Sequence, residues 1–103
     1  MKNVQKLIRD FNIKYNLGGS VEMRFIDLSS EVGELGKEIL KGTDYGKKVF
    51  SNTGNLESEF GDVLFSLISA ANSAGVDLST ALEKVLNKYE IRFNKKGHIG
   101  SEN

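Results

Sequence analysis

Apolar residues recur at helical spacing through four separate stretches of this chain, and that periodicity restricts the fold more than any other feature. Intervals of three and four residues predict helices over about 3–15, 21–40, 56–74 and 78–94. The sequence has no proline and no long run of strand-like alternation. We therefore expect an all-α, four-helix bundle-like protein with a single domain over residues 1–97 and a mobile tail over 98–103.

Each predicted helix carries a stripe of apolar side chains on one face, which we expect to form the core. The stripes are Val4, Leu7, Ile8, Phe11 and Tyr15; Phe25, Leu28, Val32, Leu35 and Ile39; Leu56, Phe60, Val63, Leu64, Leu67, Ile68 and Ala71; and Leu78, Leu82, Val85, Tyr89 and Phe93. A chain of 103 residues can hardly bury all of these internally, so the pattern favours association with further copies.

Polar and glycine-rich segments mark the predicted helix ends. The glycine pair at 18–19 permits a chain reversal, and Ser20 is suited to cap the second helix. Gly75 predicts the end of the third helix, with Asp77 or Ser79 as the cap of the fourth. The long loop over about 41–55 is unusual in a compact domain and predicts a function such as covering a site.

Charge and composition exclude several classes of protein. Fourteen basic and fourteen acidic side chains cancel, so no net field favours a nucleic acid polymer or an anionic membrane. The absence of cysteine excludes disulfides and thiolate sites. No apolar run approaches the ~20 residues of a membrane helix, and the N-terminus lacks the apolar region of a signal peptide. We expect a soluble, cytoplasmic protein.

Two acidic pairs, Glu31/Glu34 and Glu59/Asp62, fall in consecutive predicted helices. Residues three apart on a helix lie on one face, with about 5–6 Å between their Cβ atoms. Because consecutive helices tend to pack antiparallel, the two pairs could face each other and enclose a site with four carboxylates.

The first pair belongs to a longer acidic track formed by Asp27, Glu31, Glu34 and Glu38. Like charges at this spacing destabilise a helix, and a bound cation would relieve the repulsion. Ligands that are all oxygen suit Mg²⁺, Mn²⁺ or Ca²⁺ better than zinc. Since Mg²⁺ often completes its shell with substrate phosphates, the track favours phosphate chemistry.

A basic track of Lys84, Lys88 and Arg92 recurs at four-residue steps beside the apolar stripe of the last predicted helix. An anionic ligand and its metal, placed between the two tracks, would offset the repulsion within each. Lys47 and Lys48 in the long loop could also reach phosphates, although exposed loop lysines are usually only solvated.

Four segments resemble, in order, the landmarks of MazG-like nucleotide pyrophosphohydrolases, members of the all-α NTP pyrophosphatase superfamily. They are S-E-V-G-E-L at 30–35, E-S-E-F-G-D-V-L-F at 57–65, G-V-D-L-S-T-A-L at 75–82 and K-Y-E-I-R-F at 88–93. The metal motif of this family is E-x-x-E, a gap and E-x-x-D, and here 24 residues separate Glu34 from Glu59. One E-x-x-E carries almost no information, but the combination over about 25–93 is specific.

The resemblance implies hydrolysis of a (deoxy)nucleoside triphosphate to the monophosphate and pyrophosphate, with a metal-bound water as nucleophile. The metal, Mg²⁺ or alternatively Mn²⁺, would be bound by Glu31, Glu34, Glu59 and Asp62. Phosphate oxygens would be bound by Lys88 and Arg92, and more weakly by Lys84. The resemblance also implies a homodimer or homotetramer, a base pocket built partly by the neighbouring subunit, and a house-cleaning role in the nucleotide pool.

One departure from the family pattern keeps an alternative open. Many members have E-E-x-x-E, whereas Ser30 stands in place of the first acid, which leaves the number of metal ions and the rate open. The alternative is a helical interaction module of the same fold with weak or no turnover. Phosphoribosyl-ATP pyrophosphohydrolases share the helical plan, but the segments at 61–65 and 88–93 fit the first group better.

Three aromatic side chains are candidates to stack on a nucleotide base, namely Phe25, Tyr45 and Phe50.

Overall fold

The structure, a computed structural model, describes residues 1–96, and these form four helices with no strand. The helices are α1 (Lys2–Lys14), α2 (Val21–Gly42), α3 (Leu56–Ala74) and α4 (Leu78–Lys96). Each begins and ends within two residues of the sequence-based prediction, which confirms the all-α class. The predicted domain end at residue 97 and the predicted tail at 98–103 lie outside the described residues. None of the described helices is long and apolar enough to cross a bilayer.

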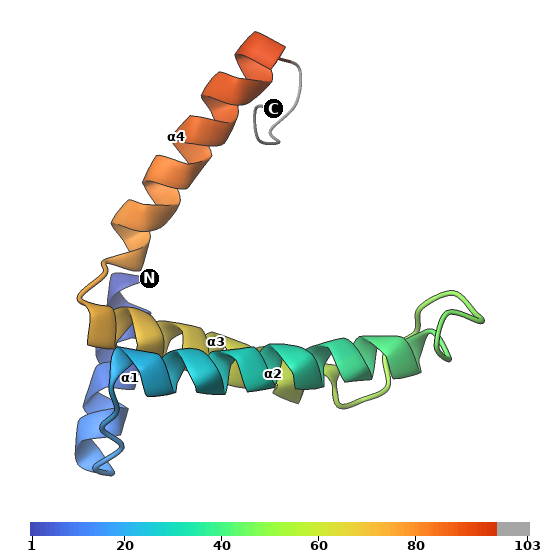
Figure 1. Cartoon of the computed structure of the whole chain (residues 1–103), viewed down its shortest axis with the longest axis horizontal. Coiled ribbons are helices and arrows are strands. Elements are labelled where there is room, and N and C mark those ends of the chain that lie inside the picture. The colour runs from blue at the N-terminus through green and yellow to red at the C-terminus, as the bar shows by residue number, and fades with distance from the viewer. Residues whose placement is uncertain (97–103) are drawn as a thin grey trace.

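The helices α2 and α3 run side by side and form the largest helix contact, while α1 packs across α3 (Figure 1). The helix α4 projects away from this layer, and the contacts that it makes are mainly with α1. The principal extents of the chain are 44 × 38 × 23 Å. The four helices therefore do not close into a bundle within one copy.

Local capping signals explain where the helices begin and end. The Ser20 hydroxyl accepts a hydrogen bond from the Met23 backbone N–H at 3.2 Å, as predicted for a cap of α2. Gly75 ends α3 in the left-handed conformation, with φ of 71°, which a residue without Cβ adopts most readily. Asp77, rather than Ser79, supplies the cap of α4, since its carboxylate accepts from the backbone N–H of Ser79 at 3.0 Å.

Gln5 on α1 fixes the turn between α3 and α4. Its side chain is only 5% exposed; the amide donates to the Val76 carbonyl at 2.8 Å and accepts from the Leu78 backbone N–H at 2.8 Å. The same amide donates to Asn72 Oδ1 at 3.0 Å, and Asn72 Nδ2 donates to the Gln5 carbonyl at 3.0 Å. Four hydrogen bonds from one residue thus set the direction in which α4 leaves α3.

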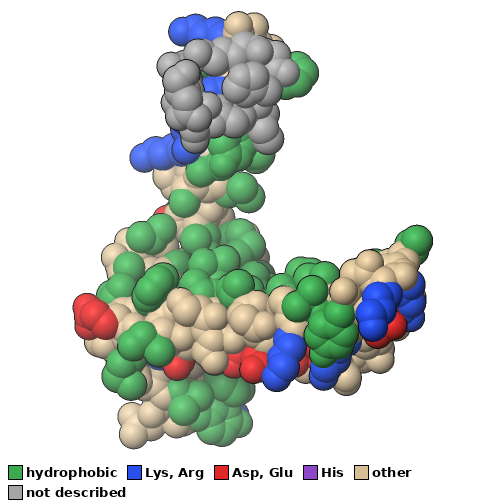
Figure 2. Space-filling model, turned by 45° about the vertical axis from the view of Figure 1, so that its right-hand side comes forward, with side chains coloured by type: hydrophobic (Ala, Val, Ile, Leu, Met, Phe, Trp, Pro, Cys, Tyr) green, Lys and Arg blue, Asp and Glu red, His purple; other side chains and the backbone are tan. Residues whose placement is uncertain are grey.

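The buried apolar core of a single copy is small. Among the described residues, the buried hydrophobic side chains are Ile68 and Ala71 of α3. Half of the predicted core side chains are exposed, among them Leu7 at 68%, Phe25 at 63% and Phe93 at 58%. Hydrophobic side chains gather in the angle between α4 and the α2–α3 layer (Figure 2). The periodicity predicted the helices correctly. The stripes form only a small core within one copy, in agreement with the expectation that a chain of this length can hardly bury all of them.

Gly42, the last residue of α2, lies in close contact with the returning part of the loop over 43–55. The Ser51 backbone N–H donates to the Gly42 carbonyl at 2.9 Å. A Cβ at Gly42 would lie 2.6 Å from the Phe50 ring and 2.7 Å from the Ser51 carbonyl oxygen. There is no room for a side chain at this position, so the glycine is needed for the loop to return along α2.

We expect Gly42→Ala to lower the free energy of unfolding by about 1–3 kcal/mol, because the added methyl group forces the loop away from α2. Gly36→Ala is the matched control in the same helix, where a Cβ would meet nothing within 4 Å. It should raise the free energy of unfolding by up to about 1 kcal/mol through helix propensity. Urea denaturation at one protein concentration measures the free energy of unfolding of both variants. Equal changes in Gly42→Ala and Gly36→Ala would show that contact with the loop does not limit the side chain at Gly42.

Candidate metal centre

Acidic side chains of α2 and α3 meet where the two helices run side by side. Glu31 of α2 and Glu59 and Asp62 of α3 each place one carboxylate oxygen within 4.8 Å of the others. Glu31 and Glu59 are half-buried and Asp62 is exposed. The structure therefore brings together three of the four carboxylates that the sequence singles out.

Glu34, the fourth predicted ligand, stands outside this group. It lies three residues beyond Glu31 on α2, and its side chain is exposed. Its negative charge is nevertheless among the causes that raise the pKa of Glu59. Glu34 is thus part of the same acidic surface without converging with the other three carboxylates in this structure.

Crowding of carboxylates and burial raise the pKa of Glu59. Burial is the largest cause, followed by the negative charges of Asp62, Glu31, Glu34 and Glu38. Over the interval between the usual and the raised pKa, the folded chain keeps a proton that the unfolded chain releases. The ion-free protein therefore loses stability as the pH rises through that interval. A cation beside Glu59 would favour its ionised form and offset this loss.

The donors at this site suit a hard divalent cation. Three carboxylates offer only oxygen, and the chain contains no cysteine that could favour a soft metal. Mg²⁺ and Mn²⁺ bind such oxygen sets and keep positions open for water or phosphate. The residues present therefore fit a metal that binds phosphates, as the sequence-based prediction requires.

Glu38, the last acid of the track, has a separate structural role. It is buried, and its carboxylate accepts from the Thr53 hydroxyl at 2.8 Å and from the Lys41 ammonium at 3.4 Å. The hydrogen bond from Thr53 is the largest cause of its lowered pKa. This contact ties the loop over 43–55 to α2. Nothing in the sequence marks Thr53 as its partner, because fifteen residues separate the two.

The predicted phosphate-binding residues lie on α4, away from the carboxylates of their own chain. Lys84, Lys88 and Arg92, together with Asn87, Ile91 and Lys95, line a groove of about 400 Å³. Because α4 projects away from α2 and α3 (Figure 1), one copy does not bring the basic and acidic tracks together. The aromatic candidates Phe25, Tyr45 and Phe50 are exposed.

The structure is thus an all-α chain in which carboxylates of two neighbouring helices gather at one place. Residues 22–96 match the model of the MazG nucleotide pyrophosphohydrolase domain, and the chain belongs to that family. The chain is 38% identical over 68 residues to a Bacillus subtilis (strain 168) protein named "Uncharacterized protein YpjD". That alignment covers 63% of this chain and 60% of YpjD. No solved structure matches the chain.

We expect Thr53→Val to destabilise the protein at neutral pH and to do so less in acid. A carboxylate with a lowered pKa stabilises the fold above its unfolded-state pKa, and this contribution is lost as the pH falls through the folded-state pKa. The difference in melting temperature from wild type should therefore shrink between neutral pH and about pH 3. Thr80→Val, at an exposed hydroxyl on α4, is the control. If the melting temperature of Thr53→Val differs from that of wild type by the same amount at every pH, the proposed role of the Thr53–Glu38 hydrogen bond is wrong.

Proposed function

We propose that this protein is a Mg²⁺-dependent pyrophosphohydrolase that converts a (deoxy)nucleoside triphosphate to the monophosphate and pyrophosphate. Membership of the MazG family supports the reaction class. The observation that carries the proposal is the convergence of Glu31, Glu59 and Asp62 within 4.8 Å. Mn²⁺ would suit the same ligands. Removal of unwanted nucleotides from the cellular pool is the role that fits this reaction.

The proposed metal ligands are Glu31, Glu34, Glu59 and Asp62. Glu34 joins the other three in this proposal because its exposed side chain can change rotamer without disturbing the packing. When bound, a divalent cation neutralises phosphate oxygens and acidifies a coordinated water. The raised pKa of Glu59 makes protons competitors of the metal, so binding strengthens with rising pH until this carboxyl is ionised.

We further propose that the phosphate contacts come from α4 of another copy, in a homodimer or homotetramer. The phosphate oxygens would be bound by Lys88 and Arg92 of that copy, and more weakly by its Lys84. The arrangement needs a second copy because α4 projects away from the α2–α3 layer of its own chain. Arginine would bind phosphate oxygens through paired donors and lysine as a point charge. The exposed apolar side chains of α4, such as Leu82 and Leu86, would be buried in the same contact.

Glu59→Gln and Asp62→Asn should each abolish metal-dependent pyrophosphate release. Without metal, each variant should be as stable as wild type or slightly more stable, because one negative charge leaves a crowded group. Glu57→Gln, in the first turn of α3 and outside the carboxylate group, is the matched control and should retain activity. Pyrophosphate release with Mg²⁺ and urea denaturation in a chelator test both parts. Near-normal turnover by either metal-site variant would show that the ligand assignment is wrong.

Arg92→Ala should raise KM for the triphosphate, and mixing it with Glu59→Gln should restore activity. If α4 acts on the neighbouring copy, a mixed dimer contains one intact site that combines the carboxylates of one chain with Arg92 of the other. Random mixing then gives about a quarter of wild-type activity with a normal KM. If Arg92 acts within its own chain, every site in the mixed dimer is defective and mixing restores nothing.

A further inference from the structure

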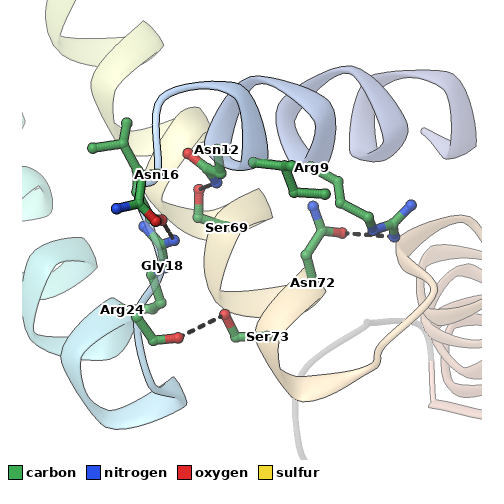
Figure 3. A pocket seen from close by; sticks show the side chains of 11 residues that line it. Arg9, Asn12, Asn16, Gly18, Arg24, Ser69, Asn72 and Ser73 are labelled. Atoms are coloured by element: carbon green, nitrogen blue, oxygen red, sulfur yellow. Dashed lines mark hydrogen bonds between the residues drawn. The ribbon is translucent and has the colours of Figure 1, made fainter.

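The contact between α2 and α3, which carries the candidate metal centre, is held at both of its ends. At the end near α1, Asn12 Nδ2 donates to Ser69 Oγ at 3.1 Å (Figure 3). Ser73 Oγ donates there to the carbonyl of Gly19, in the turn before α2, at 3.3 Å. The other end is closed by the loop between the two helices. Glu59 lies in the first turn of α3, so its position depends on how this loop end is held.

The start of α3 lacks the side-chain cap that α2 and α4 have. Asn55, the residue before the helix, makes no side-chain hydrogen bond to the first turn of α3. Ser20 and Asp77 supply such bonds to the other two helices. A helix start without a cap leaves its first backbone N–H groups without a partner and frays more readily. The position of Glu59 therefore requires another constraint.

Glu38 supplies this constraint through a chain of three hydrogen bonds. The Thr53 hydroxyl donates to Glu38 Oε2 at 2.8 Å and accepts from the Asn55 backbone N–H at 3.4 Å. The Asn55 carbonyl in turn accepts from the Glu59 backbone N–H at 3.2 Å. This hydrogen-bond chain connects a buried carboxylate of α2 with the backbone of a proposed metal ligand on α3.

Glu38 belongs to the acidic track, but both of its carboxylate oxygens are already engaged. Oε2 accepts from Thr53, and Oε1 accepts from the Lys41 ammonium at 3.4 Å. Its side chain is only 10% exposed, and it stands outside the group of carboxylates whose oxygens converge. Glu38 is therefore suited to position a neighbouring ligand rather than to bind the metal itself.

We propose that Glu38 is a positioning residue, which acts through the hydrogen-bond chain to hold Glu59 opposite Glu31 before a metal ion binds. A ligand that is already held loses little conformational freedom on binding, whereas a frayed first turn has to be ordered by the metal. Loss of a residue that orients a metal ligand weakens metal binding by about tenfold or more, although the residue does not touch the ion. This inference rests on the proposed metal-dependent function.

Thr53→Val breaks this hydrogen-bond chain and keeps the charge of Glu38, so it separates positioning from electrostatics. We expect it to raise the Kd of the protein for Mn²⁺, measured by electron paramagnetic resonance, by about tenfold. Thr53→Ser keeps the hydroxyl and should bind Mn²⁺ as wild type does. Glu38→Gln removes the charge but keeps an oxygen that accepts from Thr53, so it should weaken binding less than Thr53→Val.

Two further measurements exclude a general loss of stability as the cause. Ile68→Val removes one methyl group from the buried core of α3 and should leave the Kd for Mn²⁺ unchanged. Amide hydrogen exchange of the ion-free protein tests the hydrogen-bond chain without a metal. The Glu59 backbone N–H should exchange about tenfold faster in Thr53→Val than in wild type or in Thr53→Ser.

The possible outcomes separate this inference from the proposed function. If wild type and Thr53→Val bind Mn²⁺ equally well, the positioning role is overturned while the metal centre stands. A larger loss of affinity in Glu38→Gln than in Thr53→Val also overturns it, because charge alone would then explain the effect. If wild type binds no Mn²⁺, the proposed function fails, and hydrogen exchange decides the positioning role alone. Faster exchange of the Glu59 N–H in Thr53→Val supports that role, and unchanged exchange overturns it.

Discussion

The packing of α2 against α3 is the interaction on which the rest of the molecule depends. It brings Glu31 beside Glu59 and Asp62, and like charges at such short range oppose the helix contact that holds them together. Burial and, after it, the negative charges of the neighbouring carboxylates raise the pKa of Glu59. A pair of helices chosen for stability alone would place lysine or alanine at one of these positions. Under the proposed function, a divalent cation would offset this repulsion, so the contact that costs stability would also favour metal binding.

The α2–α3 layer and α4 carry opposite charge along their polar faces, and the structure keeps them apart within one copy. Apolar side chains of both are exposed in the angle between them (Figure 2). Exposed apolar area of this extent is rare on proteins that act alone. In the proposed assembly, the same contact buries the apolar stripes and places the basic track opposite the carboxylates. Folding, assembly and substrate binding would then be linked, because a neighbouring copy completes both the core and the site.

Features that depend on short stretches of sequence could be predicted, and features that depend on distant pairs could not. The helix ends, Ser20 and Gly75 follow from spacing and backbone preference within a few residues. The meeting of Glu31 with Glu59 and Asp62 follows from the three-residue spacing and the antiparallel order of consecutive helices. The expectation that one copy can hardly bury all the apolar stripes agrees with their exposure in the structure. What covers them could not be predicted, since periodicity identifies the apolar face of a helix without showing what packs on it.

Other contacts between helices were missed because they join residues far apart in the chain. The hydrogen bond of Asn12 with Ser69 spans 57 residues, and those of Gln5 with the turn before α4 span about 70. No local pattern marks either residue, since a polar side chain within an amphipathic helix is usually solvated. Glu34 is exposed and lies outside the carboxylate group, and three-residue spacing does not determine where an exposed side chain points.

Gln5 fixes the turn between α3 and α4, so a substitution at this residue could displace the far end of α4. The helix α4 has 19 residues and is therefore about 28 Å long. A tilt of about ten degrees at its base would swing its far end by about 5 Å, a lever effect that follows from the 1.5 Å rise per residue. Amino-acid changes at Gln5, near the start of α1, can thus move Arg92 without any change in the sequence of α4.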